Sequence, residues 1–150
     1  MSGFSFRPPE GGAPYTPPGG PPQAGPSREI FARMGQDNIF KMCADFYAAL
    51  EKSDIRPMFP PDMAEASQKL AAFLTGLLGG PPLYHERHGP PRMRARHLPF
   101  AIDERARGVW LSCFLGVLED APARYAFPPE HLPAFRTFLA EFSAWMVNRS

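Results

Sequence analysis

Apolar residues recur at three- and four-residue intervals in four long segments of the chain, which is the spacing of a helix with one buried face. These segments cover about residues 37–50, 62–78, 103–119 and 128–147. A shorter helix is predicted from Ser27 to Met34, where Gly35 is placed to end it. The pattern therefore predicts an all-α fold in which four long helices form two antiparallel pairs. Three aspartates are expected to cap long helices: Asp37, Asp62 and Asp103.

Proline and glycine divide the chain. Residues 1–26 contain eight prolines and six glycines, and only Phe4, Phe6 and Tyr15 are large apolar residues there. A segment of this composition buries too little apolar surface to fold. We therefore expect a disordered tail over residues 1–26 and one helical domain over residues 27–150. Residues 81–101 hold five prolines, so only a short helix is expected there, at about 92–98.

Charge and cysteine content narrow the class of protein. The formal net charge of +1 argues against a dedicated nucleic-acid binder. Cys43 and Cys113 lie on apolar helix faces, which favours small buried hydrophobes over a disulfide or a catalytic thiol. No signal peptide and no run of 18 apolar residues is present. These features predict a soluble cytoplasmic protein that does not enter a membrane.

One short segment, residues 91–100, combines a histidine with several arginines. His97 follows Arg92, Arg94 and Arg96 and precedes the apolar stretch Leu98-Pro99-Phe100. An imidazole beside guanidinium groups suggests that something anionic lies between them. A metal bound by the imidazole and carrying carboxylates would satisfy both groups. On its own, a histidine in an apolar segment is more often a core residue.

Other side chains offer weaker chemistry. His85 and His88 form a His-x-x-His pair in a proline-flanked loop, but a zinc site there would need further ligands. His131 is expected to face solvent. Tyr47 lies on an inward helix face, so its hydroxyl requires a buried partner or a ligand.

Several of these stretches also carry a family likeness. They are 79–84, 92–100, 107–113, Phe46-Tyr47 and Phe59-Pro60. Together they resemble the group II truncated hemoglobins, over about residues 30–148. The resemblance implies a two-over-two helical globin with heme b between the helix pairs and His97 as the proximal iron ligand.

The resemblance also implies roles for the remaining pocket residues. Lys69, Tyr84 and Arg96 match positions that hold the heme propionates. Tyr47 and Trp110 would lie on the distal side, where a phenolic O–H and an indole N–H can donate to a bound dioxygen. The apolar wall of the pocket would consist of Phe59, Ala66, Leu70, Met93, Phe100 and Ile102.

Three departures from the family pattern matter. The usual Gly-His-Pro before the basic segment is Gly89-Pro90-Pro91, so one heme-edge histidine is missing. The glycine pair near the first helix is Met34-Gly35. Ala66 occupies the place of the usual distal histidine, which leaves ligand stabilisation to Tyr47 and Trp110.

The resemblance implies reversible binding of O2, and also of NO, CO or other small ligands. An alternative is a heme-dependent redox enzyme, of peroxidase or NO dioxygenase type, which would need an external reductase because no reductase domain is present. A third hypothesis is a heme-free helical adaptor that docks through the basic face 87–96. The sequence is compatible with a monomer or a homodimer.

Overall fold

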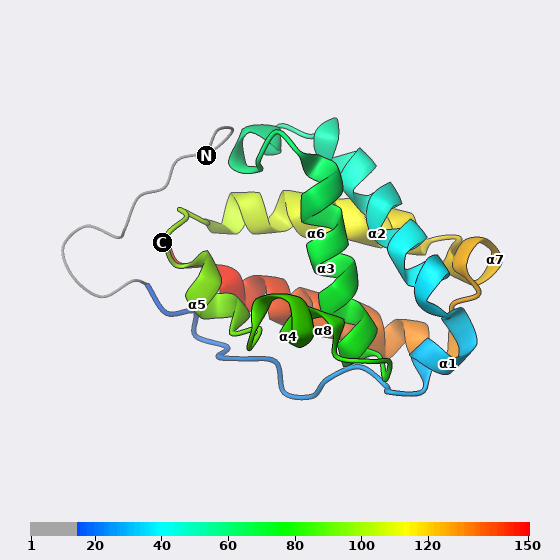
Figure 1. Ribbon diagram of the computed structural model, residues 1–150. Helices are drawn as coiled ribbons and strands as arrows, with labels where there is room; N and C mark the ends of the chain where they lie inside the picture. Colours follow the sequence, from blue (N-terminus) through cyan, green and yellow to red (C-terminus); the bar gives the residue numbers. More distant parts are fainter. Residues whose placement is uncertain (1–14) are drawn as a thin grey trace.

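Four long helices build the protein. The computed structural model describes residues 15–150, and within that range the secondary structure is entirely helical. The long helices are α2 (Gln36–Glu51), α3 (Met63–Leu77), α6 (Glu104–Leu118) and α8 (Leu132–Met146). Helix α2 packs mainly against α3, and α6 packs mainly against α8. Helix α3 crosses in front of α6 and α8 in Figure 1. The predicted all-α arrangement of two helix pairs is confirmed.

Shorter elements connect the long helices. They are α1 (Ile30–Met34), η1 (Arg56–Met58), α4 (Leu83–His88), α5 (Met93–His97), α7 (Ala121–Tyr125) and η2 (Pro129–His131). Helix α5 corresponds to the predicted helix at 92–98. Helices α4 and α7 were not predicted. In α4 the prolines lie before the helix, with Pro82 at the N-cap, and a proline there does not break a helix because its missing N–H would have no intrahelical partner.

The helix starts were only partly predicted. Asp62 accepts a hydrogen bond from the Glu65 N–H at 3.0 Å, and Asp103 accepts one from the Ala106 N–H at 2.9 Å. Both caps are therefore confirmed. The prediction for Asp37 was wrong, because Gly35, with φ of 79°, ends α1 and directly begins α2. Helix α1 also begins three residues after Ser27.

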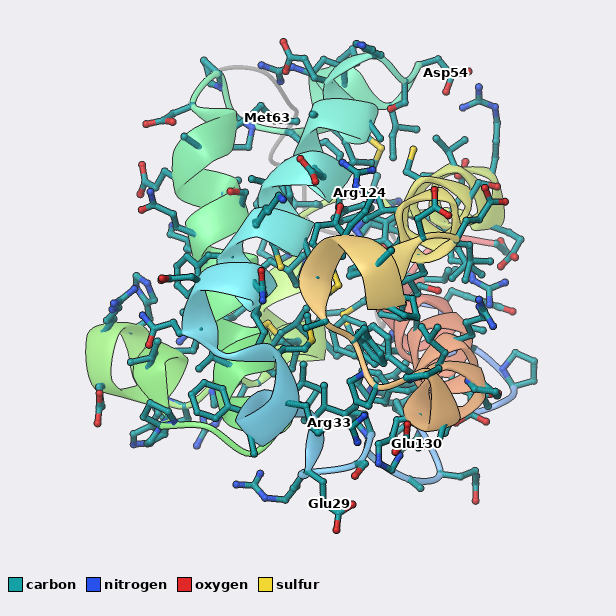
Figure 2. The ribbon with its side chains drawn as sticks, turned by 90° about the vertical axis from the view of Figure 1, so that its right-hand side faces the viewer. Glu29, Arg33, Asp54, Met63, Arg124 and Glu130 are labelled. Carbon is teal, nitrogen blue, oxygen red and sulfur yellow. The ribbon has the colours of Figure 1, made fainter. Side chains whose placement is uncertain are left out.

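Close backbone packing holds α1 against the corner between α3 and α4. The Phe31 N–H donates to the Leu78 carbonyl at 2.9 Å. A Cβ atom on Gly79 would stand 1.9 Å from the Arg28 carbonyl oxygen, and one on Gly80 would meet the Phe31 ring. On the same side of the molecule, Arg33 forms an ion pair of 2.9 Å with Glu130, as Figure 2 shows at its lower edge.

An aromatic core lies between the helix pairs. Phe46, Phe114 and Phe135 have no exposed surface, and the Phe46 and Phe114 ring centroids are 4.4 Å apart. Cys43 is also fully buried, and burial raises the pKa of its thiol. A thiol in this setting stays protonated, as expected for a small structural hydrophobe.

Residues 15–26 run over the helical surface as turns and bends. The Tyr15 carbonyl accepts a hydrogen bond from Arg94 at 2.9 Å, and the Gln23 N–H donates to Glu141 at 3.1 Å. Phe4 and Phe6 lie outside the described residues, and the disorder expected for residues 1–26 stays a prediction. No helix in the described range is long and apolar enough to cross a membrane.

Candidate functional site

His97 ends the five-residue helix α5, which lies beside the end of α8 in Figure 1. Its Nδ1 atom is 2.6 Å from the Met93 carbonyl oxygen. A carbonyl only accepts hydrogen bonds, so Nδ1 carries the proton and Nε2 presents a lone pair. Burial lowers the pKa of His97, and the hydrogen bond to Met93 opposes that shift. The imidazole is therefore neutral at neutral pH and suited to bind a metal ion through Nε2.

The residues predicted to lie around the heme faces are all partly exposed. Core aromatics such as Phe46 are fully buried, whereas all nine residues expected around the heme faces are half-buried. We expect partly exposed and largely apolar residues of this kind to line the heme cleft that the family resemblance implies. The nine residues are Tyr47, Phe59, Ala66, Leu70, Met93, His97, Phe100, Ile102 and Trp110.

Two polar aromatic residues flank Phe46. The Phe46 ring centroid lies 5.4 Å from that of Tyr47 and 5.1 Å from that of Trp110, both edge to face. Burial raises the pKa of the Tyr47 phenol, so it keeps its proton at neutral pH. Among the described residues, neither the Tyr47 hydroxyl nor the Trp110 N–H has a hydrogen-bond partner. Both groups are therefore available as donors to a ligand.

Phe59 belongs to the same group of rings, with its centroid 5.8 Å from that of Tyr47. Arg56 holds the loop that carries Phe59. Its guanidinium donates to the carbonyls of Phe59, Pro60 and Pro61 at 3.1–3.3 Å, and its Nε lies 2.5 Å from Glu51. This role of Arg56 was not predicted.

The residues expected at the propionate edge come from three helices. Tyr84 on α4 packs against Phe73 on α3, at 6.3 Å between centroids, and the Arg96 guanidinium lies 5.2 Å from the Tyr84 ring. Lys69, one turn before Phe73, is exposed and 3.6 Å from Glu65. A hollow of about 460 Å³ next to Arg96 is lined by Pro90, Arg92 and Ala95 as well.

The Arg96 guanidinium is already partly engaged. Its Nε and Nη2 atoms donate to the carbonyls of His88, Pro90 and Pro91 at 2.6–2.9 Å, while Nη1 has no partner in residues 15–150. Arg96 therefore organises the loop between α4 and α5, and the two N–H bonds of its Nη1 have no partner within the described residues.

The other histidines are arranged differently from the prediction. His85 and His88 lie on helix α4 and not in a loop, and the His88 ring packs on Tyr84 at 4.8 Å. His131 is half-buried, 3.5 Å from Glu29. Across residues 15–150, His, Cys, Asp and Glu form no cluster of three or more that could hold a metal ion.

Two further polar residues surround His97 and were missed by the sequence reasoning. Arg94 donates to the carbonyls of Trp145 and Val147 at the end of α8. Asn148 is buried and bonds the backbone of residues 97–102. Neither contact has a sequence signal, because each joins residues about 50 positions apart.

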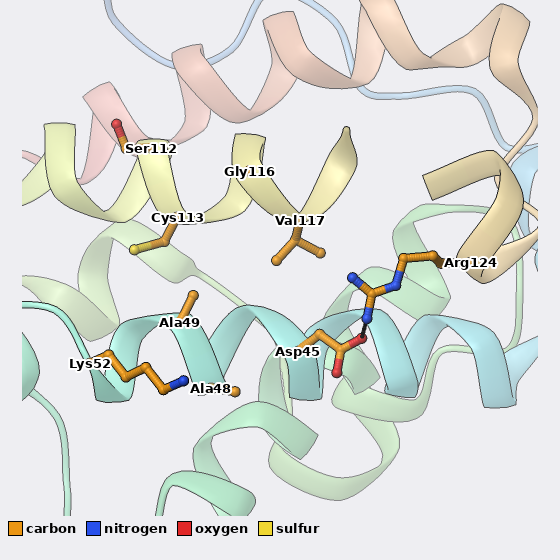
Figure 3. A pocket seen from close by; sticks show the side chains of 9 residues that line it. All are labelled: Asp45, Ala48, Ala49, Lys52, Ser112, Cys113, Gly116, Val117 and Arg124. Carbon is orange, nitrogen blue, oxygen red and sulfur yellow. Dashed lines mark hydrogen bonds and ion pairs between the residues drawn. The ribbon is translucent and has the colours of Figure 1, made fainter. Parts of the chain in front are cut away.

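A separate groove of about 490 Å³ lies between α2 and α6 (Figure 3). Small residues from both helices line it, with Ala48 and Ala49 on α2 and Gly116 on α6. Its only carboxylate, Asp45, is engaged by Arg124 at 3.1 Å and by the Tyr125 hydroxyl at 2.5 Å. None of the predicted heme residues lines this groove, so it is distinct from the expected heme site.

A helical sandwich with a neutral histidine among partly exposed apolar residues is compatible with a globin. Comparison with known proteins identifies the family. The bacterial-like globin family model matches residues 29–144. The group 2 truncated hemoglobin YjbI of Bacillus subtilis is 39% identical over 90 residues, which cover 59% of this chain and 68% of that protein.

Solved structures agree with this assignment. The group II truncated hemoglobin from Bacillus anthracis matches with a TM-score of 0.72 and 35% identity, covering 80% of this chain and 91% of that one. The truncated oxygen-avid haemoglobin from Bacillus subtilis matches with a TM-score of 0.69 and 35% identity, covering 79% and 98%. The chain belongs to the group II truncated hemoglobins of the bacterial-like globin family, and is thus a heme-binding globin.

Proposed function

We propose that this globin holds heme b in the cleft, with His97 Nε2 as the proximal iron ligand, and reversibly binds O2. NO and CO are expected to bind at the same position. The observation that carries this proposal is the 2.6 Å contact between His97 Nδ1 and the Met93 carbonyl, which leaves Nε2 as the acceptor. A backbone carbonyl behind a metal-binding imidazole orients the ring and strengthens it as a ligand.

The apolar wall supports a planar, largely hydrophobic cofactor. When bound, heme supplies an iron centre with a coordination position for a diatomic ligand. Met93, Phe100 and Ile102 come from the segment around His97, while Ala66 and Leu70 come from α3. These side chains exclude water from the cleft, which strengthens every hydrogen bond made inside it.

Tyr47 and Trp110 act on the ligand side in this proposal. Each can donate one hydrogen bond to a ligand oxygen that carries partial negative charge. Phe46 holds the two rings edge-on, and Phe59 covers Tyr47 without adding a donor. The methyl side chain of Ala66 cannot act as an acid–base catalyst, so the pocket favours ligand binding over peroxidase chemistry. A redox enzyme would also need an external reductase. The name of the Bacillus subtilis structure describes that relative as oxygen-avid.

At the open edge of the cleft, Lys69, Tyr84 and Arg96 would meet the carboxylates of the cofactor. The free Nη1 of Arg96 and the exposed Lys69 ammonium provide positive charge, and Tyr84 adds a phenolic O–H. We further propose that the protein works in the cytoplasm, as a monomer or a homodimer.

The test is a titration of the purified protein with hemin, followed by reduction and cycles of oxygenation and argon. We expect one heme per chain, a ferrous spectrum of five-coordinate heme, and repeated oxygenation without loss of the ferrous form. Protein that stays colourless with hemin would contradict heme binding. Rapid oxidation in each cycle would contradict reversible O2 binding and favour the redox enzyme.

A further inference from the structure

Asn148 connects the end of the chain to the segment that follows His97. The residue is 1% exposed. The Nδ2 group donates to the carbonyls of His97 at 3.1 Å and Phe100 at 2.8 Å, and Oδ1 accepts from the Ile102 N–H at 3.0 Å. The Asn148 N–H also donates to the Ile102 carbonyl at 2.9 Å. One residue therefore ties three backbone positions between 97 and 102.

Helix α5 needs such external support. It has only five residues, too few to be stable by itself. Arg94, three residues before His97, lies 4.5 Å above the Trp145 ring and bonds the Trp145 and Val147 carbonyls. Both sides of His97 are thus held by residues 145–148, through Arg94 before it and through Asn148 after it.

We propose that Asn148 is a positioning residue for His97, because its amide fixes the backbone that sets the direction of the imidazole. The inference rests on the proposed function, in which His97 ligates iron. It adds that the chain end beyond α8 controls the strength of that bond. The two donor bonds of Nδ2 matter most, since one of them ends on His97 itself.

The experiment measures the iron–histidine stretching band by resonance Raman spectroscopy of the ferrous, heme-loaded protein. Asn148→Ala removes all the side-chain bonds, and Asn148→Asp keeps the size and the acceptor but loses the amide donor. We expect the band to shift and broaden in both variants. We also expect heme transfer to excess apomyoglobin to accelerate by about tenfold, the effect of losing one to two net hydrogen bonds.

Ser143→Ala is the matched control. Ser143 is also buried and lies on α8, but it bonds Arg107 and Ala140 and not the segment after His97. Its removal should lower the thermal midpoint and leave the Raman band unchanged. If Asn148→Ala does not fold, Asn148→Asp gives the same comparison, and amide hydrogen exchange at Ile102 reports the freed loop in either variant.

A Raman band that stays at the wild-type position in the Asn148 variants would overturn the inference while leaving the proposed function intact. The same shift in Ser143→Ala would also overturn it, because a general loss of stability would then explain the change. An iron–histidine band that persists in His97→Ala would overturn the proposed function first, and the inference with it.

Discussion

Tyr47→Phe removes one oxygen atom from the proposed heme site and preserves the ring. The Phe side chain keeps the edge contacts with Phe46 at 5.4 Å and Phe59 at 5.8 Å. No residue of the described chain is hydrogen-bonded to the Tyr47 hydroxyl, so its loss leaves no protein group unpaired. The free protein should therefore change little in stability, and the effect should fall on the liganded state.

The size of the effect follows from one hydrogen bond. A neutral donor to a partly charged oxygen contributes about 1–1.5 kcal/mol net, which corresponds to roughly five- to tenfold faster O2 release. The assay is stopped-flow displacement of O2 by excess CO in the ferrous protein. CO carries less charge than O2, so its own dissociation rate should change less.

Tyr125→Phe is the matched control for this measurement. It also removes one buried phenolic oxygen, but Tyr125 lies on α7 and its hydroxyl donates to Asp45 at 2.5 Å. This variant should unfold more easily and release O2 at the wild-type rate. If Tyr47→Phe releases O2 within about twofold of the wild-type rate, Tyr47 does not donate to the ligand and its assigned role is wrong.

Three further predictions follow from other positions. Trp110→Phe keeps the packing on Phe46 and loses one N–H donor, so stopped-flow O2 release should again be roughly tenfold faster; an unchanged rate would remove its role. Gly79→Ala places a Cβ against Arg28 at a φ of 107°, so it should lower the free energy of unfolding, measured by urea melts, by at least about 2 kcal/mol. In the control variant Gly116→Ala the added Cβ meets nothing within 4 Å, so the free energy of unfolding should stay the same or rise. Burial and the hydrogen bond to Asp45 raise the pKa of Tyr125 above its ordinary value of 10.0. The contribution of Tyr125 to the free energy of unfolding is therefore fully present below pH 10, and it is lost above pH 10 as the tyrosine of the unfolded chain ionises. Tyr125→Phe should reduce this alkaline slope, and an equal slope would refute the coupling.

The fold could be predicted from the sequence wherever local signals were strong. The three-and-four spacing marked the four long helices, and Asp62 and Asp103 marked two helix starts by a side-chain cap. The prediction that Asp37 caps α2 was wrong because a glycine with positive φ, Gly35, joins α1 and α2 without a loop. Helix α4 was missed because its prolines were taken as breaks, although they lie before its first turn.

The residues of the candidate site could likewise be predicted from the sequence only in part. Residues on amphipathic faces, such as Tyr47 and Trp110, could be predicted from helical spacing to face inward, and both pack against the core; their place beside the heme stays a prediction. Arg94 and Asn148 could not, since each bonds backbone carbonyls about 50 residues away, and any backbone offers carbonyls. Such contacts depend on how the helices dock and leave no local pattern in the sequence.

In the proposed function, His97 ligates the heme iron, and every other assigned role depends on this bond. The most direct measurement is a histidine scan of the heme-loaded ferrous protein by resonance Raman spectroscopy, with Ala in turn at His85, His88, His97 and His131. The iron–histidine band should disappear only in His97→Ala and return when imidazole is added. A band that persists in His97→Ala, or that disappears in one of the other three variants, would contradict the account.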